Sequence, residues 1–64
     1  MKLYVENMTC GGCARGVTAS LKELDENATV NIDIPNKLVD IETQQDTAAV
    51  VAALAEDGWK AQLK

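Results

Sequence analysis

The segment that most limits the fold lies in the middle of the chain, where apolar side chains occupy every second position from residue 28 to residue 34. A period of two is typical of a strand with one face against a core and the other in water. Pro35 ends this strand, and a return strand is predicted at residues 38–42 after a turn at residues 35–37. The sequence therefore predicts a β-hairpin that needs a cover on one face. The residues predicted to face water are Thr29, Asn31, Asp33, Asp40 and Glu42.

A strand and a helix are predicted before the hairpin. Residues 2–7 form the strand, and residues 8–12 form a loop. From Cys13 onward, apolar residues recur at helical spacing and predict a helix that ends near Asp25. The apolar stripe of this helix is Val17, Leu21 and Leu24.

A helix and a strand are also predicted after the hairpin. The helix begins near Asp46, whose carboxylate suits an N-cap, and ends at Gly58. Its predicted buried stripe is Thr47, Val50, Val51 and Leu54. The last strand covers residues 59–63, with inward side chains at Trp59, Ala61 and Leu63.

The predicted order of elements is strand, helix, strand, strand, helix, strand. Two helices on one face of a four-stranded antiparallel sheet would bury both helical stripes and leave the other sheet face in water. This is the α+β, ferredoxin-like βαββαβ sandwich. We expect one domain that spans residues 1–64.

The charge of the chain excludes several classes of partner. A net charge of −4 and a pI near 4.5 argue against binding to nucleic acid or to anionic lipid, both of which need a basic surface. No apolar run approaches the roughly 20 residues of a membrane span, and no secretory signal pattern is present. We therefore expect a cytoplasmic protein with neither nucleic-acid binding nor membrane insertion.

The only two cysteines, Cys10 and Cys13, lie in the predicted loop and near the first turn of the first helix. A helix N-terminus favours a thiolate. Gly11 and Gly12 are expected to let the backbone turn tightly enough to bring the two sulfurs together. The pair could be a metal clamp, a redox couple, a structural disulfide or a coincidence.

The type of ligand distinguishes among metals. Thiolates favour soft ions, Cu(I) foremost, whereas structural zinc normally takes four Cys or His ligands. This chain has no histidine and no third cysteine, so a soft ion held by two sulfurs fits better. Such an ion stays open to attack by an incoming thiolate, which favours a carrier over an enzyme.

The chain resembles the heavy-metal-associated domains, which include small copper chaperones and the amino-terminal domains of metal-transporting P-type ATPases. Their motif, Met-x-Cys-x-x-Cys between the first strand and helix, is matched by Met8, Cys10 and Cys13. The element order and the helix-end Gly58 before an aromatic residue also fit, so the resemblance covers essentially the whole chain.

The resemblance implies that Cys10 and Cys13 bind one Cu(I) and pass it on through sulfur-bridged intermediates. The implied partner is the metal-binding domain of a copper-transporting P-type ATPase or a copper-responsive regulator, and a metal-bridged homodimer is a further assembly of this type. Thr9 is similar to the copper-binding members, because zinc-binding members often carry an acidic residue there. Mercury-binding relatives share the threonine, so Ag(I), Hg(II) and Zn(II) stay as alternative ions.

Further residues are expected to support the site. Met8 should pack in the core beneath the loop, and Trp59 should be mainly core while shielding the sulfurs from water. Arg15 and Lys60 could offset the negative charge of the loaded pair. Asn7 and Trp59 depart from the family, which commonly has Gly before the Met and Tyr, Phe or Lys near the site. The complete supporting set is Met8, Thr9, Gly11, Gly12, Trp59 and Lys60.

A small thiol–disulfide redox protein is the alternative from another functional class. It would use the same cysteine pair and turn over on a disulfide substrate. A thioredoxin-type couple would be expected to have a proline between its cysteines and a larger fold around them. Here both intervening residues are glycines.

Overall fold

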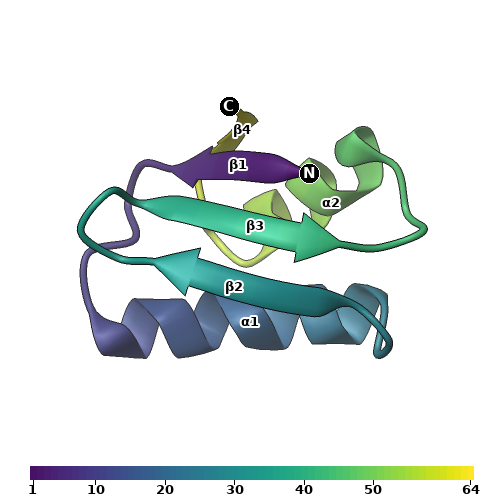
Figure 1. Ribbon diagram of the computed structural model, residues 1–64, viewed down its shortest axis with the longest axis horizontal. Coiled ribbons are helices and arrows are strands. Elements are labelled where there is room, and N and C mark those ends of the chain that lie inside the picture. The colour runs from purple at the N-terminus through teal and green to yellow at the C-terminus, as the bar shows by residue number, and fades with distance from the viewer.

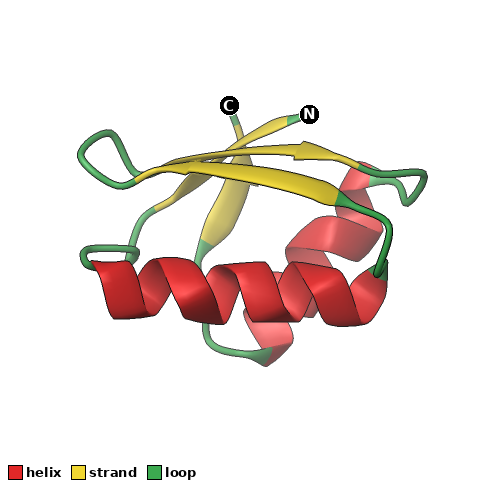
Figure 2. Ribbon diagram, turned by 60° about the horizontal axis from the view of Figure 1, so that its bottom comes forward, coloured by secondary structure: helices red, strands yellow, loops and turns green.

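The computed structural model describes residues 1–64 and contains six elements in the predicted order. They are β1 (Lys2–Val5), α1 (Gly11–Leu24), β2 (Thr29–Asp33), β3 (Leu38–Glu42), α2 (Thr47–Glu56) and β4 (Ala61–Leu63). The sheet order is β2-β3-β1-β4, and all neighbouring strands are antiparallel. Both helices cover one face of the sheet (Figures 1 and 2). The predicted α+β, ferredoxin-like sandwich is confirmed.

The central hairpin matches its predicted alternation. The five residues predicted to face water are all exposed, whereas Val39 and Ile41 of β3 are buried. Val30 and Ile32 face the same side but are half-buried, because β2 is an edge strand. Asn36 donates backbone and side-chain hydrogen bonds to the Asp33 carboxylate in the turn.

The core lies between the sheet and the two helices. Its residues are Leu3, Val5, Met8, Val17, Leu21, Ala28, Val39, Ile41, Val50 and Leu54. Val17 and Leu21 of the first predicted stripe are buried and Leu24 is half-buried. In the second stripe, Val50 and Leu54 are buried, whereas Thr47 and Val51 are half-buried.

Helix α2 has defined signals at both ends. Asp46 is its N-cap, as predicted, and its Oδ1 accepts a hydrogen bond of 2.8 Å from the backbone N of Ala49. At the other end, Gly58 has φ +89°, which an L side chain rarely adopts. The backbone N of Trp59 donates to Leu54 O at 2.9 Å and that of Gly58 to Ala55 O at 3.0 Å. These two bonds form a Schellman motif, which fixes the direction in which the chain leaves the helix.

Four predicted details at the ends of elements are wrong. Strand β1 ends at Val5, because the next residues turn and Met8 N bonds back to Val5 O. Helix α1 begins at Gly11, two residues before Cys13. Strand β4 begins at Ala61, since the backbone N of Lys60 bonds a side chain instead of a neighbouring strand. Leu63 is 60% exposed: it pairs with buried Leu3, but it lies near the end of an edge strand.

The lengths of the helices also bear on the membrane prediction. Neither helix has the length and apolar character needed to cross a bilayer.

Candidate metal-binding site

The loop that carries the cysteines is anchored by a buried methionine. The Met8 side chain is fully buried within the core, as predicted, and its backbone N donates to Val5 O at 3.2 Å. Because its thioether is enclosed by the core, Met8 supports the loop from below. Thr9 and Cys10 then emerge at the surface.

Cys10 and Cys13 lie at the junction of this loop with α1. Cys10 is the N-cap residue, with an extended backbone of φ −152° and ψ 172°, and its carbonyl accepts from the backbone N of Ala14 at 3.1 Å. Cys13 is the third residue of the helix and is half-buried, whereas Cys10 is exposed. Both thiols are free, and their Sγ atoms are 3.3 Å apart.

This separation follows from helix-cap geometry. The side chain of an N-cap residue normally reaches back over the third residue of its helix, as in the capping box. Cys10 and Cys13 occupy these two positions. Gly11 and Gly12 have no positive φ, so the expectation that they supply a special tight turn is wrong. They form the exposed first turn of the helix between the two sulfurs.

The electrostatics of the helix start favour ionisation of Cys13. A hydrogen bond from the Thr9 backbone is the main cause that lowers the pKa of the Cys13 thiol, and the Cys10 side chain lowers this pKa further. Partial burial of Cys13 acts in the opposite direction and is outweighed. A lowered pKa makes the thiolate, the form that binds metals, more populated at neutral pH.

Trp59 packs closely against the same helix. A Cβ atom placed on Gly16 would lie 2.8 Å from Trp59 Cζ2, so the indole occupies the space that any other residue at position 16 would fill. Gly16 is three residues after Cys13, and residues with this spacing share one helix face. Trp59 is half-buried against the core, as predicted, and lies one helical turn from Cys13.

Asn7 was not predicted to contact any part of the site, yet it joins two loops. Its Nδ2 donates to Gly58 O at 2.9 Å, and its Oδ1 accepts from the backbone N of Lys60 at 2.9 Å. The backbone N of Glu6 adds a third bond, to Lys60 O at 2.9 Å. The one sequence signal was the polar side chain itself, at a position where relatives commonly have glycine.

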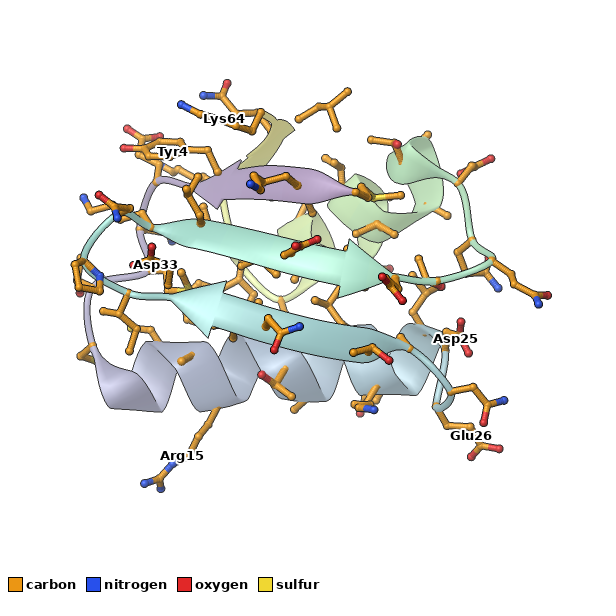
Figure 3. The ribbon with its side chains drawn as sticks, in the orientation of Figure 1. Tyr4, Arg15, Asp25, Glu26, Asp33 and Lys64 are labelled. Carbon is orange, nitrogen blue, oxygen red and sulfur yellow. The ribbon has the colours of Figure 1, made fainter.

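The charged residues near the pair have no carboxylate partners. The one ion pair in the chain joins the N-terminal amine and Asp40 at 4.0 Å, so Arg15 and Lys60 are free of such contacts. Figure 3 shows Arg15 projecting from α1 away from the sheet, while Asp25 and Glu26 lie at the opposite end of this helix. No group of three or more Cys, His, Asp or Glu side chains gathers anywhere in the chain. The cysteine pair is therefore a two-donor site without a third protein ligand of these types.

Solved structures with this fold include several metal-handling proteins. A gold binding protein matches with a TM-score of 0.97 and 39% identity, over 100% of this chain and 98% of the other. The copper chaperone Atx1 from Synechocystis PCC6803 matches with a TM-score of 0.93 and 29% identity, over 97% of this chain and 98% of that one.

Sequence comparison identifies the family. The copper transport protein ATOX1 of Rattus norvegicus is 42% identical over 52 residues, which are 81% of this chain and 75% of the rat protein. The human ATOX1 protein is 40% identical with the same coverage. The family model of the heavy-metal-associated domain matches residues 2–58. The chain belongs to the heavy-metal-associated domain family.

Proposed function

We propose that this protein is a metallochaperone that binds one Cu(I) between Cys10 and Cys13 and delivers it to a partner by exchange of thiolate ligands. The observation that carries the proposal is the 3.3 Å separation of two free sulfurs at a helix start on the surface. The copper transport proteins and copper chaperone among the relatives support the choice of ion.

The chemistry of the donors supports a soft monovalent ion. Thiolates prefer Cu(I), and a site with only two of them does not offer the four ligands of a structural zinc site. Two thiolates and one Cu(I) leave a single negative charge, which the unpaired cations Arg15 and Lys60 would partly offset. The lowered pKa of Cys13 reduces the cost of losing its proton when the metal binds.

Delivery follows from the difference in exposure between the two cysteines. Cys10 is exposed and precedes the helix, whereas Cys13 is half-buried within its first turn. An incoming thiolate would bind the ion, Cys10 would leave first, and Cys13 would hold the ion until a second partner thiolate replaces it. A partner with a similar cysteine pair fits this exchange, such as the metal-binding domain of a copper-transporting P-type ATPase or a copper-responsive regulator. A second copy of this chain could form a metal-bridged homodimer by the same contacts.

Other soft ions fit the same two donors. The similarity to a gold binding protein supports binding of Ag(I) or Hg(II) as well as Cu(I), because all of these ions favour sulfur. Thr9 contributes no carboxylate, so Zn(II) would have to complete its coordination from outside the chain. We therefore expect the affinity for Zn(II) to be well below that for Cu(I).

A thiol–disulfide redox protein is the second candidate function. The short distance between the sulfurs and the lowered pKa of Cys13 favour it, because both also help a cysteine pair to form and exchange a disulfide. A redox protein would turn over on a disulfide substrate, whereas a carrier binds metal once per chain.

An anaerobic Cu(I) titration of the reduced protein against a competing chromophoric chelator tests the proposal. We expect one Cu(I) per chain, withdrawn from a strong chelator, and loss of this binding in Cys10→Ser and in Cys13→Ser. Met8→Leu is the matched control, because it removes a buried sulfur of similar volume and should leave the stoichiometry unchanged. If the chelator keeps the copper and the protein instead turns over on a disulfide, the redox function replaces this proposal.

A further inference from the structure

We infer that Asn7 is a positioning residue that latches the cysteine loop to residues 57–60 and so slows the opening of the loop that releases the metal. The inference rests on the proposed function, since metal release is the step that the latch would control. It concerns a side chain that is not itself a metal ligand.

The latch consists of two hydrogen bonds that use both ends of one carboxamide. Asn7 Nδ2 donates to Gly58 O and Asn7 Oδ1 accepts from Lys60 N, each at 2.9 Å. These contacts join positions 51 and 53 residues apart in the chain. Asn7 is exposed and uncharged, so these two bonds are the interactions through which its side chain can act.

The partner segment is itself held in place from three sides. Ser20 of α1 donates a short hydrogen bond to the Asp57 carboxylate. The Schellman motif fixes Gly58 and Trp59 to the end of α2, and the Trp59 indole lies on Gly16 of α1. A loop tied to this segment is therefore tied to a fixed point.

The arrangement closes a ring that includes both cysteines. Residues 57–60 contact α1 at Gly16 and Ser20, within two turns after Cys13. They contact the loop at Asn7, three residues before Cys10. Cys13 moves with the helix and Cys10 moves with the loop, so a change in the distance between their sulfurs must break the ring or strain it. The Asn7 bonds are its exposed, and hence weakest, link.

The size of the effect follows from the number of bonds. Two neutral hydrogen bonds at the surface correspond to a change of about 5- to 30-fold in an opening equilibrium. Asn7 has no positive φ, so Asn7→Ala removes the bonds without a conflict with the backbone. Asn31→Ala is the matched control, because Asn31 is an exposed asparagine on β2 without a side-chain hydrogen bond.

The first test uses amide hydrogen exchange in the metal-free protein. Met8 N and Ala14 N bond to Val5 O and Cys10 O, so their exchange reports opening of the loop at positions that Asn7 does not touch. Asn7→Ala should accelerate exchange at both amides about 5- to 30-fold. Val50 N, which bonds Asp46 O in α2, should change no more than in Asn31→Ala. Equal acceleration at Val50 would mean general destabilisation and would overturn the inference.

The second test measures the rate at which copper-loaded protein gives up Cu(I) to excess chelator. Asn7→Ala should release the ion about 5- to 30-fold faster than Asn31→Ala. Faster loop exchange with an unchanged release rate would overturn the role of Asn7 in metal retention. If the unmodified chain takes up no copper, the proposed function fails, and the exchange rates at Met8 and Ala14 alone decide whether the latch exists.

Discussion

The close contact between Gly16 and Trp59 makes a prediction with a defined sign. In Gly16→Ala, the new Cβ would lie 2.8 Å from Trp59 Cζ2, which is about 0.6 Å inside the 3.4 Å at which ordinary contact begins. Overpacking of this kind costs about 1–3 kcal/mol, whereas alanine gains about 1 kcal/mol over glycine within a helix. The free energy of unfolding should therefore fall by about 0–2 kcal/mol, against the usual benefit of this substitution.

Gly11→Ala is the matched control for this substitution. It adds the same methyl group to the same helix, but no atom lies within 4 Å of the new Cβ. It should leave stability unchanged or raise it by up to about 1 kcal/mol. Both variants can be compared by urea unfolding of the reduced, metal-free protein, with Trp59, the only tryptophan, as the fluorescent reporter. Gly16→Ala should also shift the emission of folded Trp59, because the indole must move away from the helix. Equal stabilisation of both variants, with the emission unchanged, would refute the reasoning.

Three further predictions concern single side chains. Asp46→Ala removes the N-cap bond of α2 and should lower the free energy of unfolding by about 0.5–2 kcal/mol in urea unfolding, while Asp46→Asn should retain most of it. Hydrogen bonds from the Thr43 hydroxyl and the Asn27 backbone lower the pKa of Asp25, so its contribution to stability is present above about pH 4 and is lost as the pH falls through the lower folded-state pKa. Thr43→Val should make the urea midpoint less sensitive to acid between pH 5 and 2, and an unchanged sensitivity would contradict this cause. The lowered pKa of Cys13 should place the midpoint of its alkylation rate, followed by peptide mass spectrometry, below the value of about 8.5 for an ordinary thiol; a midpoint at or above that value would contradict the role given to the Thr9 backbone.

Local periodicity was sufficient to predict the fold. The alternation around Val39 and Ile41 and the helical spacing of Val17 and Leu21 report which side of each element is buried, and the structure places these side chains in one core. Periodicity does not report where an element stops. The ends of β1, α1 and β4 depend on backbone bonds to turns and side chains, and the exposure of Leu63 depends on its place at an edge of the sheet. These details come from tertiary contacts, which sequence spacing does not contain.

The candidate site was only partly predictable for the same reason. The spacing of Cys10 and Cys13 and their place before a helix predicted two adjacent sulfurs, although helix-cap geometry, and not a glycine turn, brings them together. The partners of Asn7 lie more than 50 residues away, so no local pattern could indicate them. Gly16 did leave a signal, because a glycine inside a helix often marks the close approach of another group.

Copper K-edge X-ray absorption of the loaded monomer, without added thiol, tests the central claim most directly, because it counts the atoms bound to copper. The account predicts two sulfur neighbours and no nitrogen or oxygen neighbours in the wild-type protein, and loss of this signal in Cys10→Ser. A metal shell of three or four ligands in the monomer, or an unchanged shell in Cys10→Ser, would contradict a site built from the Cys10–Cys13 pair alone.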